Sequence, residues 1–193
     1  FREAPFNEVD NLILAQLVYV EFAGIVPAPG EEGTITVKEA CELFFAAHDR
    51  KEIMERVSMT KTAAFVLEKM AQTERFCNAQ LFGYINDISK EEQSQFSVVC
   101  VRLDDKSIYV SFSGTDNTIV GWRENFNMGY LSETPGQLKA VDYLNHMVKE
   151  DWKKIRVGGH SKGGNLSVYA SVKCDRNIQK RIVKVYSNDG PGF

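Results

Sequence analysis

The chain carries, at positions 157–164, the stretch Val157-Gly158-Gly159-His160-Ser161-Lys162-Gly163-Gly164, which contains a G-x-S-x-G pattern. A serine between two glycines at this spacing is typical of a nucleophile elbow, a tight turn from a strand into a helix. Glycine is needed beside the serine because the neighbouring backbones approach closely there. We therefore predict a positive or otherwise sparsely allowed φ at Ser161 and close packing of Gly159 against Gly163.

The residues on either side of this stretch agree with a strand, a turn and a helix in that order. Lys153 to Val157 has apolar residues at alternate positions, which favours a strand. Leu166, Tyr169 and Ala170 follow at helical spacing and form an apolar stripe. The alternative is a glycine-rich turn that carries a serine without any chemical role.

A second stretch lies upstream, where the β-rich run Ser107 to Phe112 leads into Gly114-Thr115-Asp116. In an acyl-transfer hydrolase, the loop after such a strand supplies one N–H of the oxyanion hole, and the residue after the nucleophile supplies the other. We predict that the backbone amides of Thr115 and Lys162 have these roles, and that they converge beside the Ser161 hydroxyl. The Thr115 hydroxyl is a further candidate donor. On its own, a Gly-Thr-Asp turn is an ordinary structural feature.

Together these motifs resemble those of the class 3 lipases of the α/β-hydrolase superfamily. The resemblance is closer to a bacterial lipase-like domain family of unknown function, and it rests on residues 110–116, Gly121-Trp122 and residues 159–164. For the hydrolase motifs the resemblance spans the chain from about residue 80 to residue 193, and the amino-terminal helical part resembles the smaller family only. The resemblance implies a serine hydrolase with an α/β-hydrolase-type, mostly parallel sheet flanked by helices, preceded by a helical amino-terminal segment.

The chain departs from the class 3 lipase pattern at two positions. The arginine that usually precedes Gly-Thr is Ser113 here, which affects the support of the oxyanion loop. The leucine that usually follows the nucleophile is Lys162, which is expected to place a cation beside the site.

Hydrophobic periodicity divides the chain into a helical part, residues 1–76, and a sheet core, residues 77–193, within a single domain. Asn7 is a candidate cap for a helix whose apolar face is predicted to hold Val9, Leu12, Ile13, Leu17 and Val20. Thr36 to Glu39 has the pattern of a capping box that begins a second helix. Strands are expected at residues 81–88, 96–103, 107–112 and 182–187, so that an antiparallel start leads into a parallel sheet.

The general base is the missing component of the predicted triad. Serine hydrolases of this type follow the order nucleophile, acid, histidine, and no histidine follows Ser161. His48, His146 and His160 are poor candidates by their positions. The chain begins with Phe1 and stops directly after a strand, so we expect a carboxy-terminal truncation, with the histidine beyond residue 193. Asp189, just past the last strand, is the candidate acid.

Composition excludes several classes of function. A length of 193 residues with 44% hydrophobic and 25% charged residues suits an ordinary globular domain. The net charge of −3 and the lack of a basic stripe argue against nucleic-acid binding, and no apolar run is long enough for a transmembrane segment. The four cysteines lack metal-ligand spacing, so we expect buried thiols in the cytoplasm and neither a metal nor a cofactor.

Residues 122–131 are rich in aromatic side chains and are either a lid over the site or a packed loop, with Trp122 expected in the core.

The leading hypothesis is a lipase or esterase that forms an acyl-enzyme at Ser161 with a small-molecule or lipid ester. The alternative is a catalytically inert α/β-hydrolase fold used for binding or as a scaffold. The sequence does not predict the oligomeric state.

Overall fold

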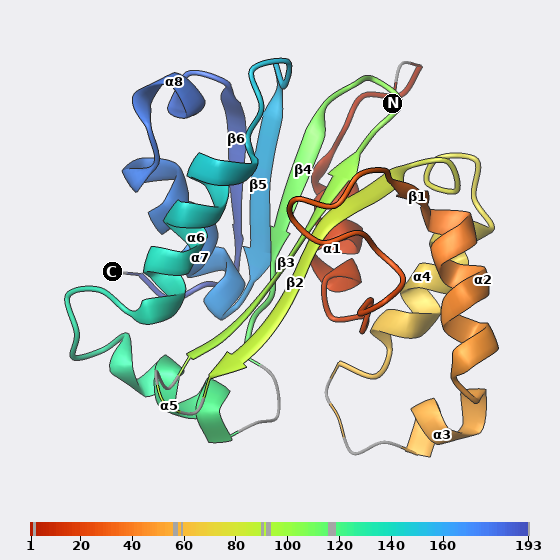
Figure 1. Cartoon of the computed structure of the whole chain (residues 1–193), viewed down its shortest axis with the longest axis horizontal. Coiled ribbons are helices and arrows are strands. Elements are labelled where there is room, and N and C mark those ends of the chain that lie inside the picture. The colour runs from red at the N-terminus through yellow and green to blue at the C-terminus, as the bar shows by residue number, and fades with distance from the viewer. Residues whose placement is uncertain are drawn as a thin grey trace.

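The computed structural model describes residues 1, 3–55, 58, 60–89, 91, 94–115 and 119–192. Its centre is a sheet of six strands in the order β1-β2-β3-β4-β5-β6, with helices on both faces (Figure 1). The strands are β1 (Ile35–Thr36), β2 (Gln80–Ser89), β3 (Ser94–Arg102), β4 (Ile108–Phe112), β5 (Ile155–His160) and β6 (Ile182–Asn188). The helices are α1 (Glu8–Leu17), α2 (Val37–Ala47), α3 (Arg50–Glu55), α4 (Ala63–Ala71), α5 (Ile119–Asn127), α6 (Pro135–Met147), α7 (Lys162–Lys173) and α8 (Arg176–Gln179).

The sheet is mixed, so the prediction of a mostly parallel sheet is wrong. Strands β1 to β4 pair antiparallel, and only the pairs β4–β5 and β5–β6 are parallel. The reason lies in the connections. Ser89 to Ser94 and Arg102 to Ile108 are too short to hold a crossover helix, whereas helices separate β4 from β5 and β5 from β6. The predicted antiparallel start followed by parallel strands is confirmed.

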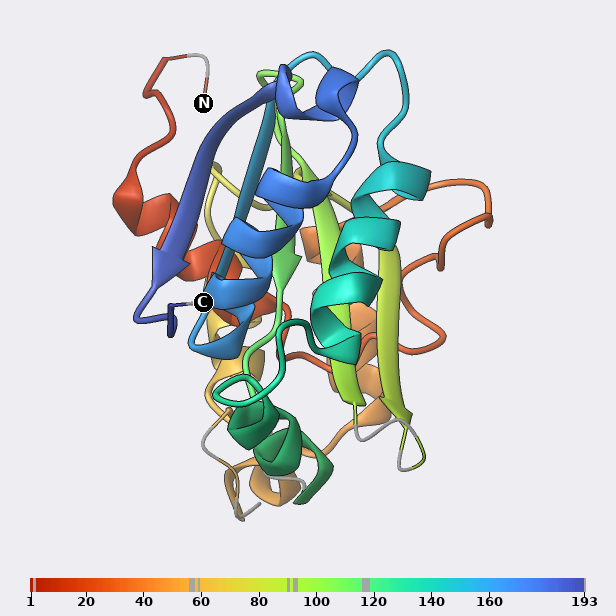
Figure 2. The ribbon, with the colours of Figure 1, turned by 90° about the vertical axis from the view of Figure 1, so that its left-hand side faces the viewer.

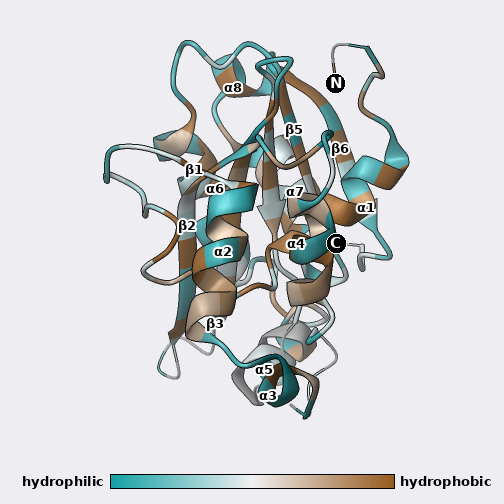
Figure 3. Cartoon of the chain, turned by 90° about the vertical axis from the view of Figure 1, so that its right-hand side faces the viewer, coloured by the Kyte–Doolittle hydropathy of each residue, from teal (hydrophilic) through white to brown (hydrophobic). Residues whose placement is uncertain are grey.

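Each face of the sheet has its own core. Helices α6 and α7 lie side by side on one face (Figure 2), where they pack on a cluster that includes Val98, Cys100 and Leu166. Helices α1, α2 and α4 cover the other face, over Val99 and Val101. Neighbouring residues of β3 thus enter opposite cores, because successive strand side chains point to opposite sides. Figure 3 shows hydrophilic and hydrophobic residues in bands along α2, as in a helix with one buried side.

Helix α1 begins where the sequence predicts, but it buries only part of the predicted apolar face. Asn7 accepts hydrogen bonds from the Val9 and Asp10 amides, which confirms the predicted cap. The side chains of Val9 and Leu12 are 63% and 52% exposed, whereas Asp10 and Asn11 are buried. The predicted apolar face is confirmed at Leu17 and Val20, which are buried, and wrong at Val9 and Leu12, because polar partners of Asp10 and Asn11 fix the rotation of the helix. The capping box from Thr36 to Glu39 is confirmed at the start of α2.

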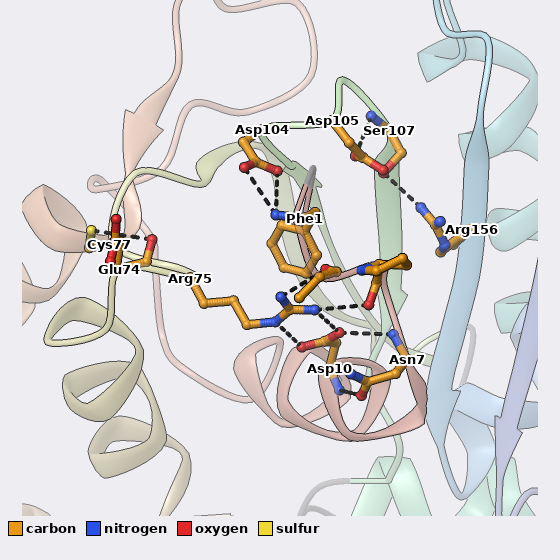
Figure 4. Close-up of polar contacts among 12 residues, drawn as sticks. Phe1, Asn7, Asp10, Glu74, Arg75, Cys77, Asp104, Asp105, Ser107 and Arg156 are labelled. Carbon is orange, nitrogen blue, oxygen red and sulfur yellow. Dashed lines mark hydrogen bonds and ion pairs between the residues drawn. The ribbon is translucent and has the colours of Figure 1, made fainter.

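Arg75 ties the amino-terminal segment to the rest of the protein (Figure 4). Its guanidinium donates to both carboxylate oxygens of Asp10 at 2.6 Å, and to the carbonyl oxygens of Ala4 and Pro5. The α-amino group of Phe1 lies 2.9 Å from Asp104 in the turn between β3 and β4. A bidentate arginine–carboxylate pair with an almost fully buried carboxylate fixes both position and orientation. The segment before α1 is therefore held against the sheet.

Other features of the fold differ from the sequence analysis or extend it. The short elements β1, α3, α5 and α8 were not predicted, and Trp122, expected in the core, is 49% exposed. All four cysteines are free thiols, and burial raises the pKa of Cys100 to about 12. No helix in the described part of the chain combines the length and the apolar composition that crossing a membrane requires.

Candidate active site

Ser161 lies in the turn between β5 and α7 with φ 55° and ψ −126°. The predicted positive φ is therefore confirmed, and so is the order strand, turn, helix, although β5 continues to His160. The Ser161 amide donates to the carbonyl oxygen of Asn188 on β6 at 2.9 Å, and the Gly164 amide donates to the Ser161 carbonyl oxygen at 2.9 Å. A serine in this backbone region is strained unless its surroundings hold it there.

The glycines of the motif allow the backbones to approach closely. A Cβ added at Gly159 would lie 2.5 Å from the carbonyl carbon of Gly163, well inside the 3.0 Å that real Cβ atoms keep from other atoms. A Cβ added at Gly163 would collide with the carbonyl oxygen of Phe112 and lie 2.8 Å from the carbonyl carbon of Ser113. The predicted close packing of Gly159 and Gly163 is confirmed, and the end of β4 takes part in it.

The loop after β4 lies against the elbow. Phe112 pairs with Gly159 in the parallel ladder, and a Cβ at Gly114 would lie 3.3 Å from Cβ of Ser161. Thr115 is the next residue, and its hydroxyl is buried with no hydrogen-bond partner among the residues that the structure describes. The motif residue Asp116 lies outside them. The structure thus brings Thr115 and Ser161 into the same part of the molecule.

Lys162 is the first residue of α7, a position whose N–H is not used by the hydrogen-bond ladder of a helix. Its side chain is 0% exposed, and its Nζ donates to the backbone and side-chain oxygens of Gln95 at the start of β3, the latter at 2.9 Å. Gln95 in turn donates to the Ser113 hydroxyl at 3.3 Å. The cation expected beside the site therefore lies inside the protein, where it is bound to Gln95 behind the loop after β4. Convergence of the Thr115 and Lys162 amides stays a prediction.

Asp189 follows β6 at the same edge of the sheet as Ser161. It is exposed, has φ 53°, and is next to Asn188, whose carbonyl oxygen binds the Ser161 amide. The chain then crosses the start of α7, where Asn165 donates to the carbonyl oxygens of Pro191 and Gly192. The role of Asp189 as the acid stays a prediction.

None of the three histidines hydrogen-bonds to the Ser161 hydroxyl in the part of the chain that the structure describes. His48 stacks on Phe44, and its Nδ1 lies 2.9 Å from the Phe44 carbonyl oxygen. His146 is near the end of α6, which leads into the amino end of β5, and it lines a cleft with Arg102 and Trp152, whereas Ser161 follows the carboxyl end of β5. Within the described part of the chain, neither His160 nor any other residue hydrogen-bonds to the Ser161 hydroxyl.

Sequence reasoning missed a polar network behind the elbow. Asn188 donates to the carbonyl oxygen of Gly159 at 3.0 Å, and Asn11 donates to the Asn188 side chain at 2.8 Å. The buried Tyr109 hydroxyl donates to Asn11 at 2.7 Å. These residues come from α1, β4 and β6, so no local sequence pattern marks them. The network holds the end of β5 in place.

Tyr19, just after α1, was also missed. Its hydroxyl oxygen accepts a hydrogen bond from the Gly114 amide at 2.9 Å, and burial raises the pKa of this phenol. Tyr19 and Ser113 line a cleft of about 210 Å³, which is bordered mainly by polar side chains.

A larger cleft of about 670 Å³ lies between residues 28–34 and the end of α6, away from the elbow. Among the described residues, no group of three or more acidic, histidine or cysteine side chains is placed to bind a metal ion.

Comparison with known proteins places most of this region in one family. A family model described as Mbeg1-like matches residues 70–193, which include the elbow and the loop after β4. Residues 1–69, with Asn11 and Tyr19, lie outside the match. No curated protein and no solved structure matches the chain.

Proposed function

We propose that this chain, which belongs to the Mbeg1-like family of lipase-like domains, is a serine hydrolase that cleaves a carboxylic ester through an acyl-enzyme on Ser161. The observation that carries the proposal is the backbone of Ser161, with its φ of 55° at the junction of β5 and α7. Strain of this kind persists where the surrounding structure enforces it, and it is concentrated at functional sites. Assignment to the α/β-hydrolase superfamily, as one domain, belongs to the same proposal.

The proposed reaction begins with attack of the Ser161 oxygen on the ester carbonyl carbon. The hydroxyl proton passes to a histidine, which we assign to a position outside residues 1–193, with Asp189 as the acid that orients it. The amides of Thr115 and Lys162 stabilise the charge on the former carbonyl oxygen. The histidine then protonates the leaving alcohol, and water releases the acyl group from Ser161 by the same steps.

The substrate class that we propose is a small-molecule or lipid ester. The aromatic side chains of α5 and the following turn are a candidate wall for the acyl chain, since Trp122, Phe126 and Tyr130 are exposed. We also propose a cytoplasmic location, because the four cysteines are free thiols and such thiols persist in a reducing compartment.

Labelling of the natural protein with a fluorophosphonate tests the proposal. We expect one adduct on the peptide that contains Ser161, formed by the native protein and not after denaturation, because only the folded site activates the serine. Ser161→Ala is the matched control and should give no adduct. If the native wild-type protein is not labelled at Ser161, the inert binding or scaffold protein is the better interpretation.

Substitutions at Thr115 test the oxyanion loop. Thr115→Pro removes the backbone N–H, and we expect kcat to fall roughly 100- to 1000-fold. Thr115→Ala keeps the amide, and because the hydroxyl has no partner among the described residues, its loss should lower kcat by less than about tenfold. The measurement is the steady-state hydrolysis of p-nitrophenyl acetate. Equal large losses would show that the side chain carries the role assigned to the amide.

A further inference from the structure

The side chain of Tyr19 contacts the candidate oxyanion loop, although Tyr19 lies outside residues 70–193, which the family model matches. The Gly114 N–H donates to its hydroxyl oxygen at 2.9 Å. A Cβ placed on Gly114 would contact both this oxygen and, at 3.3 Å, Cβ of Ser161. The Tyr19 hydroxyl, the loop and the candidate nucleophile are therefore immediate neighbours.

The Tyr19 hydroxyl has a proton to donate. A phenol hydroxyl both accepts and donates, and the Gly114 amide occupies its accepting side. Its own O–H donates to no residue in the part of the chain that the structure describes. Burial raises the pKa of this phenol, which keeps it protonated, so that it suits the role of a donor and not that of a base.

We infer that Tyr19 is a catalytic residue of the proposed hydrolase, whose hydroxyl donates a hydrogen bond to the oxyanion formed when Ser161 attacks the ester. The inference rests on the proposed function. No proton is transferred in this step: the carbonyl oxygen gains the electron pair of the broken π bond, and the Tyr19 O–H stabilises that charge beside the two backbone amides. The Gly114 N–H fixes the tyrosine oxygen before the charge develops, which is the condition for effective stabilisation.

The cleft beside the loop offers a matched control, because a second tyrosine lines it. Tyr84 on β2 borders the same cleft, and its hydroxyl donates to Glu21 at 3.2 Å. Its ring packs edge-on against Phe22. Tyr84→Phe thus removes a buried hydroxyl from the same cleft without touching Gly114 or the loop.

The experiment compares Tyr19→Phe, Tyr84→Phe and the wild-type natural protein in hydrolysis of p-nitrophenyl acetate. We expect Tyr19→Phe to lower kcat by about 100-fold with little change in KM, because the lost hydrogen bond forms only as the oxyanion develops. Phenylboronic acid, whose adduct with a serine is tetrahedral, should bind Tyr19→Phe more weakly by a similar factor. Tyr84→Phe should keep kcat within about threefold of wild type.

The role of Tyr19 is tested by three possible results. If Tyr19→Phe equals Tyr84→Phe in kcat, or changes only KM, Tyr19 is a wall of the cleft and the inference is overturned while the proposed function stands. If the wild-type protein is neither labelled nor active, the proposed function fails, and the role of Tyr19 fails with it. Should Tyr19→Phe not fold, 3-fluorotyrosine at position 19 keeps the hydroxyl and lowers the phenol pKa. The alkaline loss of kcat should then move to lower pH, and an unchanged pH profile would overturn the inference.

Discussion

We expect Ser161→Ala to lower kcat for ester hydrolysis by at least about 10⁴-fold, since the substitution removes the atom that forms the acyl-enzyme. The residual rate would come from the oxyanion donors alone, which still stabilise attack by water. The measurement is hydrolysis of p-nitrophenyl acetate by the natural protein and the variant at saturating substrate.

Two further variants separate chemistry from folding in this experiment. Ser161→Gly is equally inactive, but glycine accepts a φ of 55° without strain, so we expect its free energy of unfolding to rise by about 1 kcal/mol. Ser171→Ala, near the end of α7, removes a hydroxyl that, among the residues the structure describes, bonds to the Ser167 carbonyl alone, and it should keep full activity. Retention of wild-type hydrolysis by Ser161→Ala would contradict the assignment of the nucleophile.

The second large effect concerns Gly163, whose hydrogen atoms face the end of β4. An alanine methyl group there would overlap the carbonyl oxygen of Phe112 and the carbonyl carbon of Ser113. These atoms belong to the backbone and are held by the ladders of the sheet, so they cannot rotate away. We expect Gly163→Ala to lower the free energy of unfolding by at least about 3 kcal/mol, at the upper end of the cost of overpacking.

Gly192→Ala is the matched control, because a Cβ at that position would meet no atom within 4 Å. Its free energy of unfolding should stay within about 0.5 kcal/mol of wild type. Urea denaturation followed by circular dichroism measures both variants. Gly163→Ala with an unchanged urea midpoint would mean that the elbow and the β4 loop are farther apart than described.

The features that the sequence predicts correctly depend on neighbouring residues. The cap at Asn7, the capping box at Thr36, the strand before Ser161 and the turn itself are set by side chains within a few positions of one another. The strand and turn pattern correctly predicted antiparallel strands followed by parallel ones, whereas the family resemblance overstated the parallel share of the sheet. The lengths of the two short connections, which prevent crossovers, were visible in the sequence and are the better guide.

The features that the sequence could not predict depend on contacts between distant positions. Tyr19 bonds to Gly114, and Asn11 bonds to Asn188, across 95 and 177 positions of the chain. The buried face of α1 was misjudged for the same reason, since Arg75 and Tyr109 select Asp10 and Asn11 over the apolar Val9 and Leu12. Hydrophobic periodicity counts a polar residue as outward-facing, and it has no means of recognising a buried polar partner.

The position of α1 on the sheet has a consequence for biosynthesis. This helix is synthesised before β2 to β6, yet its hydrogen-bond partners on the sheet follow 97 and 177 positions later: Ser111 of β4 donates to the Leu14 carbonyl oxygen, and Asn11 bonds to Asn188 of β6. At a translation rate of about 5–20 residues per second, the side chains of Leu14 and Leu17 stay unburied for on the order of ten seconds, until the strands that cover them have been made. The nascent chain therefore exposes the apolar side of α1 while β2 to β5 are being translated, and we expect a chaperone that binds short amphipathic segments to act in that interval.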